Sequence, residues 1–402
     1  MTASLGRPFW TVWTAATVST LGDGIRYVAF PLLAASLTRD PRAVALVSAA
    51  GYLPWAVFGL LSGAIVDRVD RRRLMYRIDF GRAVLVGGFA VLVAEQQAPV
   101  GALALVSFVL GSAETFFDNA ASAILPMLVP EHGLERANSL TTVSQNVMST
   151  LIGAPLGSLL FGLAHEVPLT ADAATFLLAA ALVATVPGYY VARTAGARSR
   201  VRTDVADGLR WLWRNRLLRT LCGLLAVVNL TLAAGEAVLV LYAYEVLHLS
   251  SFGYSVLLAV LAVGGVAGAL VAAPLRARLG LLPSVLTASV GLTAGLVLAG
   301  ATSSVAAAAT GLALFGAGIS VWNVVTVSLR QRIVPADLLG RVTSSYRVVG
   351  LAATPLGAAA GGLVAKAFGL HAPYLAGGAV LGACTLLALP SLRVSAAAAT
   401  TA

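Results

Sequence analysis

Residues 59–82 read GLLSGAIVDRVDRRRLMYRIDFGR, and this stretch decides how the chain is organised. An apolar run ends abruptly at Asp67, five arginines follow between positions 68 and 77, and a second apolar run begins directly afterwards. Lys and Arg next to membrane spans stay on the cytoplasmic side of a bilayer. The stretch therefore predicts a short, arginine-rich cytoplasmic hairpin between two hydrophobic helices.

The composition predicts an integral membrane protein. Of the 402 residues, 58% are hydrophobic and only 11% are charged, whereas soluble domains carry about 25% charged residues. The net charge is +10, but the charged residues lie in short segments between apolar runs. We interpret this basic balance as membrane topology and contact with the lipid bilayer, and we expect no nucleic-acid partner. Cys222 and Cys384 lie in separate apolar runs without metal-ligand spacing, so we expect no metal site and no cofactor.

Twelve apolar runs divide the sequence, and each is long enough to cross a bilayer as a helix of about 20 residues. Only helices and closed barrels satisfy backbone hydrogen bonds in lipid, and barrel strands would be about half as long. The predicted fold class is therefore an all-α integral membrane protein with twelve transmembrane helices. The runs lie near 10–36, 43–66, 76–94, 99–128, 139–164, 168–191, 217–246, 253–275, 280–300, 304–329, 342–367 and 371–391.

The distribution of arginine predicts the orientation of these helices. With a cytoplasmic N-terminus, the inner segments hold nearly all of the loop arginines, above all 67–75, 192–216 and 330–341. The outer loops hold only Arg39 and Arg42. Because positive residues mark the inner side, we expect a multi-pass protein of the cell membrane with both termini in the cytoplasm.

The two halves of the sequence repeat each other. Residues 63–66 (GAIV) recur as residues 268–271 (GALV), and residues 155–157 (PLG) recur as residues 355–357. A polar segment separates the halves, and its end alternates Leu and Trp with Arg, which indicates an amphipathic helix at the membrane interface. Two related six-helix halves are typical of transporters built from parallel repeats. The expected domains are an N-terminal half over 1–191, a cytoplasmic linker over 192–216 and a C-terminal half over 217–402.

The hairpin resembles the signature loop between helices 2 and 3 of the major facilitator superfamily. That signature has a Gly, three residues, Asp-Arg, any residue, Gly, any residue and two basic residues. The matching positions here are Gly63, Asp67, Arg68, Arg72 and Arg73, and Asp70 stands in place of the second Gly. The resemblance covers nearly the full length and implies the two-halved, pseudo-symmetric fold of that superfamily, a small-molecule substrate and a monomer.

Further motifs resemble the bacterial branch of enterobactin-exporter-like and macrolide-efflux-like proteins within that superfamily. They are residues 114–118 (ETFFD), residues 128–130 (LVP) with 136–138 (RAN), and residues 153–158 (GAPLGS). The last is similar to the antiporter motif GPxxGG, with Ala154 where Pro is usual and Ser158 where the last Gly is usual. This branch implies efflux of small amphiphilic compounds such as drugs, antibiotics or siderophore-like molecules.

The resemblance also implies that the arginine-rich hairpin is a gate. Asp67 would dock onto the entrance of the eleventh helix near residues 341–343 in the outward-open state, because arginines and a helix N-terminus both attract a carboxylate. The alternative is a loop with solvated charges that only sets the topology. The expected gating residues are Gly63, Asp67, Arg68, Arg71, Arg72 and Arg73.

Carboxylates inside the apolar runs are candidates for proton coupling, because ionisable groups are costly in a membrane. Glu114 and Asp118 share a helix face by their i, i+4 spacing. This pair either exchanges a proton, with Arg71 or Arg72 reaching towards Asp118, or forms a static salt bridge. The proton-coupling candidates are Asp23, Glu114, Asp118, Asp172 and Glu236.

Other intramembrane residues have two readings each. Asp23 either pairs with Arg26 or faces a central cavity, where it binds a proton or a cationic substrate. Asp172 is either functional or merely interfacial, and Asp79 with Arg82 is expected to form a local structural pair. Residues expected to line or support a cavity, with lipid-facing packing as the alternative for the aromatic ones, are Arg26, Phe117, Pro155, Tyr242 and Trp322.

Three functions remain open at the level of the sequence. The first is a secondary active transporter, a proton-coupled exporter of small amphiphilic molecules that works by alternating access. The second is an importer or facilitator of a small metabolite with the same fold, and the third is a membrane scaffold or sensor. No Walker, HExxH or GxSxG pattern occurs, so we expect no directly ATP-driven pump, no enzyme and no catalytic residue.

Overall fold

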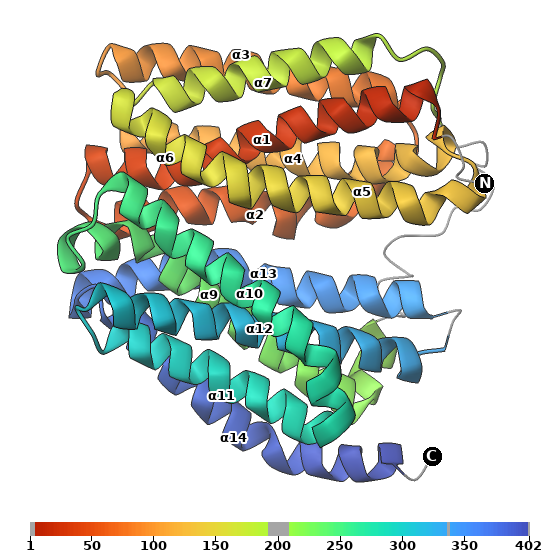
Figure 1. The fold of residues 1–402 in the computed structure, drawn as a ribbon, viewed down its shortest axis with the longest axis vertical. Coiled ribbons are helices and arrows are strands. Elements are labelled where there is room, and N and C mark those ends of the chain that lie inside the picture. Colours follow the sequence, from red (N-terminus) through yellow and green to blue (C-terminus); the bar gives the residue numbers. More distant parts are fainter. Residues whose placement is uncertain (1–4, 192–208, 336–337, 401–402) are drawn as a thin grey trace. The chain divides into compact units, whose positions relative to one another are not determined.

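A computed structural model describes residues 5–191, 209–335 and 338–400, and this part of the chain contains helices and no strands (Figure 1). Ten of its helical segments are long and apolar enough to cross a membrane. Two further long helices, α1 (Gly6–Leu37) and α3 (Arg71–Ala94), carry charged residues within their apolar stretches. The all-α membrane fold predicted from the apolar runs is therefore confirmed.

The chain divides into two compact units. The described parts of Met1–Arg39 and Ala50–Arg198 form unit 1, and those of Asp40–Ala49 and Ser199–Ala402 form unit 2. The remaining elements of the N-terminal part are α2 (Pro41–Val66), α4 (Val100–Leu128), η1 (Glu131–Gly133), α5 (Leu134–Asn146), η2 (Val147–Gly153), α6 (Ala154–Leu163) and α7 (Val167–Ala184). Those of the C-terminal part are α9 (Arg216–Leu241), η3 (Tyr242–Val246), α10 (Ser251–Leu279), α11 (Leu281–Gly300), α12 (Val305–Ile333), α13 (Leu339–Phe368) and α14 (Ala372–Thr400).

The helices of unit 1 pack around α1, α3 and α7. Helix α1 contacts α7, α6 and η2, and α3 contacts α7 and α4. In Figure 1, the ribbons of α3, α7 and α1 run side by side along unit 1. This packing brings side chains from α1, α3, α4 and α7 into one region, although they are far apart in the sequence.

The same pattern of helix pairs recurs in unit 2. Helix α9 contacts α14 and α13, as α1 contacts α7 and α6, and α11 contacts α14 and α12, as α3 contacts α7 and α4. The core of unit 2 includes Trp322, which is 1% exposed among Leu221, Val325 and Tyr346. The repeated sequence motifs therefore correspond to a repeated arrangement of helices.

Local sequence explains several helix boundaries. Asp70 precedes α3, and its side chain accepts hydrogen bonds from the backbone N–H groups of Arg72 and Arg73, which is a typical N-cap. Helix α3 thus begins at Arg71, inside the segment expected to be a loop.

Helix α7 ends at Ala184, earlier than the apolar run at 168–191 indicates. Pro155, which has no N–H, follows the π-helix η2, where the regular hydrogen-bond ladder is already interrupted.

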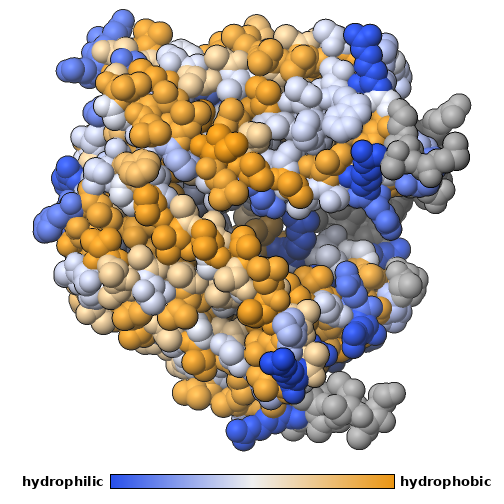
Figure 2. All heavy atoms as spheres, viewed as in Figure 1, coloured by the Kyte–Doolittle hydropathy of each residue, from blue (hydrophilic) through white to orange (hydrophobic). Residues whose placement is uncertain are grey.

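Many large apolar side chains lie on the outer surface. Exposed examples include Leu105, Leu163, Leu270 and Leu387, each more than 60% exposed. Figure 2 shows orange, hydrophobic side chains over much of the visible face of the protein. An exposed apolar surface of this extent is typical of the part of a membrane protein that contacts lipid.

Candidate functional site

Unit 1 contains a cluster of ionisable side chains inside its helices, which we call the carboxylate cluster. Helices α1, α3 and α4 each contribute two of its residues, and α7 contributes one. The spacing in the sequence places each pair of residues on one helix face, and the packing of the helices brings the faces together. The members are Asp23, Arg26, Asp79, Arg82, Glu114, Asp118 and Asp172.

Arg26 connects carboxylates from three helices. Its Nη2 donates to Asp23 Oδ1 over 2.7 Å and to Glu114 Oε2 over 2.9 Å. Its Nε lies 3.8 Å from Asp172 Oδ2. The side chain of Arg26 is 13% exposed, so these contacts form largely out of water, where charge-assisted hydrogen bonds are strong. Arg26 therefore ties α1 to α4 and α7.

Arg82 is the second cation of the cluster and is buried. Its Nη1 lies 3.5 Å from Asp79 Oδ1 and 4.0 Å from Asp23 Oδ2. Its guanidinium group also lies over the rings of Phe117 and Phe176, with 5.2 Å and 5.1 Å to the ring centroids. These cation–π contacts partly replace the water that a buried guanidinium loses. Asp79 and Arg82, expected to be a local pair, are thus part of the larger cluster.

Asp118 differs from the other carboxylates in its partners. Within the described residues, it forms no hydrogen bond and no ion pair, and it is partly exposed. The charges that act on it come from Glu114, Asp23 and Arg82. The loop arginines do not reach it, because Arg71 binds Asp67 and Met127 and Arg72 binds the end of α7. The expected link between Asp118 and the hairpin arginines was wrong.

The balance of charge in the cluster is strongly negative. Five carboxylates meet only two guanidinium groups, so three negative charges have no compensating arginine when every group is ionised. Uncompensated charge of one sign is costly away from water. The arrangement therefore favours the binding of positive charge, either as protons on the carboxylates or as a cationic ligand.

Glycines allow the helices around the cluster to approach closely. A side chain at Gly22 would overlap Asp172 and Thr175 of α7. An added Cβ at Gly153 would lie 2.9 Å from the Cα of Gly24 and 2.9 Å from the carbonyl oxygen of Leu21. Residues 153–158, which resemble the antiporter motif, therefore pack directly on the segment of α1 that carries Asp23 and Arg26. Pro155 lies in the first turn of α6.

The hairpin motif forms its own set of contacts within unit 1. Arg71 Nη2 lies 3.0 Å from Asp67 Oδ1. Arg72 donates to the carbonyl oxygens of Val183 and Ala184, over 3.2 Å and 2.5 Å, and so satisfies the C-terminal end of α7. Arg73 lies over the ring of Tyr189, 5.8 Å from its centroid. The two other residues expected to form the gate have fewer close neighbours. Arg68 is exposed, and a Cβ at Gly63 would meet no atom within 4 Å.

The other candidate residues, Glu236, Tyr242 and Trp322, belong to unit 2. Glu236 is half-buried on α9. Tyr242 is 1% exposed, and its hydroxyl donates to the carbonyl oxygens of Ala299 and Thr302, over 2.6 Å and 2.8 Å. Tyr242 therefore satisfies the C-terminal end of α11, and Trp322 fills the core of unit 2.

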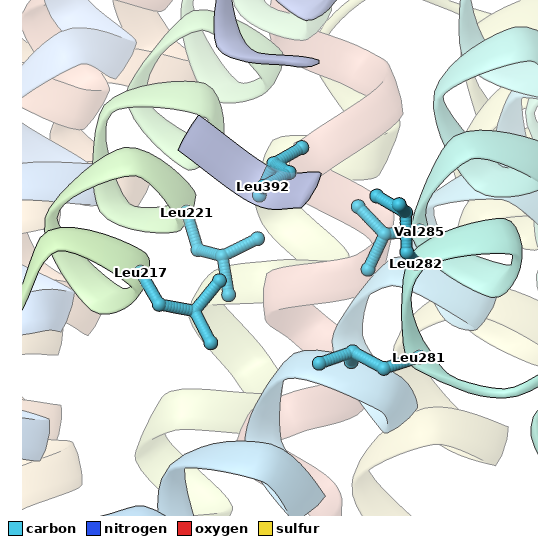
Figure 3. A pocket seen from close by; sticks show the side chains of 6 residues that line it. All are labelled: Leu217, Leu221, Leu281, Leu282, Val285 and Leu392. Carbon is cyan, nitrogen blue, oxygen red and sulfur yellow. The ribbon is translucent and has the colours of Figure 1, made fainter. Parts of the chain in front are cut away.

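Unit 2 also contains a small pocket between α9, α11 and α14 (Figure 3). Its lining is entirely apolar and consists of Leu217, Leu221, Leu281, Leu282, Val285 and Leu392. Substrate sites combine apolar walls with a few polar groups that orient the ligand. This pocket offers no such group, and we interpret it as a packing gap.

Sequence reasoning missed how the cluster is assembled. Asp172 was expected to be either functional or interfacial, and it is 1% exposed beside Arg26. Arg82 was assigned only to Asp79, although its contacts extend to Asp23 and two aromatic rings. The available signal was the charged residues within α1 and α3, the two long helices that are not among the ten candidate membrane spans. No group of His, Cys, Asp and Glu in the described residues is arranged to hold a metal ion.

Comparison with known proteins decides the family. A family model described as transmembrane secretion effector matches residues 5–401. The chain belongs to this family of the major facilitator superfamily. An MFS-type transporter of Bacillus subtilis, YfiS, is 27% identical over 96% of this chain and 93% of its own. The multidrug efflux pump Tap of Mycolicibacterium fortuitum is 27% identical over 94% of this chain and 93% of its own.

Other similar proteins agree with this assignment. Macrolide efflux protein A of Streptococcus pyogenes is 28% identical over 38% of this chain and 38% of its own. Among solved structures, the nucleoside transporter NupG aligns over 96% of this chain and 100% of its own, with a TM-score of 0.75 and 12% identity. A bacterial homologue of the iron transporter ferroportin covers 96% of this chain and 99% of its own, with a TM-score of 0.73 and 18% identity. This chain is therefore a multi-pass membrane transporter and not an enzyme, as the sequence predicted.

Proposed function

We propose that this transporter is a proton-coupled exporter of small amphiphilic compounds across the cell membrane. Two lines of support favour export: relatives named as multidrug and macrolide efflux proteins, and residues 153–158, which resemble the antiporter motif. The observation that carries proton coupling is the carboxylate cluster of unit 1, in which five carboxylates meet two arginines. The proposal includes a monomer with both termini in the cytoplasm.

The chemistry of the coupling follows from the partners of each carboxylate. Asp118 has no ion pair within the described residues and is partly exposed, so a proton reaches it without breaking a salt bridge. Glu114 lies one turn away and is held by Arg26, whose other partners are Asp23 and Asp172. A proton on Asp118 reduces the negative charge around Glu114 and Arg26. Proton binding thereby changes the forces between α1, α4 and α7, which is what coupling to helix movement requires.

The hairpin is proposed to act as the gate of this cycle. Asp67 is 66% exposed at its side chain while it pairs with Arg71, so its carboxylate remains accessible to a further partner. Arg72 fixes the hairpin to the end of α7. The proposal assigns the docking of Asp67 at the start of α13, near Arg341, to the outward-open state.

Transport in inverted membrane vesicles tests the proposal. The probe is a fluorescent compound whose cellular accumulation falls on expression of the protein, and uptake is measured with and without a pH gradient. We expect gradient-driven uptake by the unmodified protein and its loss in Asp118→Asn, because the neutral amide cannot carry the proton. Asp118→Glu should retain gradient-driven uptake.

Two outcomes would contradict the proposal. Uptake that ignores the gradient in the unmodified protein indicates a facilitator instead of a proton-coupled exporter. Gradient-driven uptake that survives Asp118→Asn removes Asp118 from the proton path. A control variant, Asp40→Asn, removes a carboxylate outside the cluster and should leave the gradient dependence intact.

A further inference from the structure

A row of uncharged polar side chains lies on one face of α5 and the start of η2, and we call it the α5 stripe. Spacings of three and four residues place these positions on the same side of the helix. The buried residues Ala137 and Ser144 lie on the opposite side, toward the core of unit 1. The members of the stripe are Asn138, Ser139, Thr142, Gln145, Asn146 and Ser149.

The side chains of the stripe are available to a ligand. The five members from Asn138 to Asn146 are exposed, and none of them forms a side-chain hydrogen bond within the part of the chain that the structure describes. Ser149 is half-buried, and its hydroxyl donates to the carbonyl oxygen of Gln145 over 2.7 Å. Asn, Gln, Ser and Thr each carry donors and acceptors. The stripe therefore presents both kinds of hydrogen-bonding group in one row.

The second half of the stripe lies at the depth of the membrane. Helices α5, η2 and α6 form one span over Leu134–Leu163, seen as one continuous rod in Figure 1. The apolar residues of this span are concentrated toward Leu163. A helix crosses the hydrocarbon core with about 20 residues, which reach back from Leu163 to about residue 144. Gln145, Asn146 and Ser149 thus lie within the hydrocarbon thickness.

Lipid is an unfavourable neighbour for these side chains. An amide that loses water without gaining a new hydrogen-bond partner is costly in hydrocarbon. The lipid-compatible side chains of the same span are elsewhere, because Leu151, Leu159 and Leu163 are exposed and apolar. The span therefore separates a polar face from an apolar one, as expected for a helix that has lipid on one side and a water-filled pathway on the other.

The π-helix η2 ends the stripe and joins it to α1. Each bond of a π-helix reaches back five residues, so the faces of the helix rotate relative to the preceding α-helix, and such segments occur frequently at functional sites. After this rotation, the backbone of Ser149 and Gly153 packs on Gly24, where an added Cβ would meet backbone atoms. The stripe thus leads from α5 to the turn of α1 that carries Asp23 and Arg26.

We propose that the α5 stripe binds the uncharged polar groups of the substrate, such as hydroxyl, carbonyl or glycosyl groups. The charged residues of α5, Glu135 and Arg136, lie in its first turn before the stripe, so the stripe itself offers neutral donors and acceptors. A site built to hydrogen-bond a ligand discriminates against analogues that leave its polar groups unpaired. The inference rests on the transport function proposed above and specifies its substrates as amphiphilic compounds with several uncharged hydrogen-bonding groups.

Binding of two matched probes to the purified protein tests this inference. Digitoxin and digitoxigenin share one steroid body, and only digitoxin carries a chain of sugars. Neither compound is charged near neutral pH, so charge does not enter the comparison. Equilibrium dialysis in detergent measures the affinity for each. We expect saturable binding of digitoxin, about tenfold tighter than that of digitoxigenin, because only the sugars provide several partners for the stripe.

Substitutions in the stripe locate the binding surface. Gln145→Leu and Asn146→Leu should each weaken digitoxin binding about fivefold, the effect of losing one neutral hydrogen bond, and should leave digitoxigenin binding unchanged. Asn146→Gln keeps an amide and should retain most of the affinity. Gln97→Leu makes the same change at an exposed glutamine beyond the end of α3 and should alter nothing. Thermal unfolding shows that each variant is folded.

Cysteine labelling tests whether water reaches the stripe. In a background with Cys222→Ser and Cys384→Ser, Asn146→Cys in inverted vesicles should react with a small water-soluble maleimide. Leu151→Cys should not react, because a thiol in lipid stays un-ionised. Digitoxin should slow the labelling of Asn146→Cys.

The inference is overturned if neither probe binds saturably, if digitoxin binds no more tightly than digitoxigenin, or if Asn146→Cys is not labelled. Equal losses for both probes in Gln145→Leu and Asn146→Leu would indicate a packing role and would also overturn it. Failure of the proposed function gives a different result, because dialysis uses no pH gradient. Digitoxin binding at the stripe together with gradient-independent vesicle uptake would support the inference and contradict proton coupling.

Discussion

At the scale of single residues, the ionisable side chains of the cluster find their partners on several helices. Arg26 is the clearest case, because it holds Asp23 and Glu114 by hydrogen bonds and lies near Asp172. Three carboxylates lose their common cation when it is removed. Breaking a buried ion pair by removing one partner is more damaging than never having formed the pair.

The first residue-scale prediction concerns the stability of Arg26→Met. We expect this substitution to lower the free energy of unfolding by about 3 kcal/mol at neutral pH, because the carboxylates left behind repel one another. The loss should shrink at pH 5, where protons on the carboxylates replace the missing cation. Thermal unfolding in detergent at both pH values measures the effect. A loss of stability of equal size at both pH values would show that Arg26 acts through packing and not through charge.

The second residue-scale prediction concerns Asp40, which lies outside the membrane-spanning segments. Hydrogen bonds from the Arg42 side chain and backbone N–H lower the pKa of Asp40 from 3.8 to about 2. Because the pKa of Asp40 is lower in the folded protein than in the unfolded chain, its carboxylate stabilises the fold at every pH above the unfolded pKa. This stabilisation is lost only as the pH falls through about 2. Its charge is thus constant between pH 5 and pH 8. Asp40→Asn should keep the pH profile of vesicle uptake, and a shifted profile would refute this.

At the scale of elements, the approach of α1 to the segment that follows α5 positions the cluster. The π-helix η2 ends at Gly153, and Gly153 contacts Gly24 of α1 without a side chain between them. Gly157 approaches Ile25 of α1 in the same way, one turn later. These contacts hold α1 so that Arg26 faces α4 and α7. The antiporter-like motif is thus linked to the cluster by backbone packing.

The prediction at this scale compares two glycines of the same region. Gly153→Ala should destabilise the protein by about 1–3 kcal/mol, because its Cβ would press on backbone atoms that cannot move aside. Gly162→Ala should leave the stability unchanged or raise it by up to about 1 kcal/mol, since a Cβ at Gly162 meets no atom within 4 Å and alanine favours helix. Thermal unfolding of both variants provides the measurement. Equal effects of the two substitutions would exclude close packing at Gly153 as the cause.

At the scale of the whole molecule, the positions of the arginines at the ends of the apolar helices predict how the protein is oriented in the membrane. The arginines of the hairpin lie between α2 and α3 and in the first turn of α3, and the last turns of α10 and α12 carry Arg276, Arg278, Arg330 and Arg332. All of these belong to the ends that the sequence assigned to the cytoplasm. Positive residues at one set of helix ends set the direction of insertion.

The prediction for the whole molecule is its topology. In a background with Cys222→Ser and Cys384→Ser, Gln97→Cys should react with a membrane-impermeant maleimide in intact cells. Asn138→Cys should react only after the cells are permeabilised. Both positions are exposed, so a difference in labelling reports the side of the membrane. Labelling of Asn138→Cys in intact cells would reverse the proposed orientation.

The sequence by itself determined the membrane class, the succession of apolar helices, the repeated halves and the superfamily. These properties follow from composition, from hydropathy along the chain and from short motifs such as residues 63–73, all of which are local. It also identified Asp23, Glu114, Asp118 and Asp172 as unusual, because a charge within an apolar run is visible without any structure.

Only the tertiary structure decided which of these charges meet. Arg26 and Asp172 lie on helices far apart in the sequence, and their 3.8 Å approach depends on the rotation and packing of α1 and α7. The same packing places Arg82 over Phe117 and Phe176 and leaves Asp118 without an ion pair among the described residues. Helical spacing fixes which residues share a face, but the faces that oppose each other are fixed by close contacts such as that of Gly153 with Gly24.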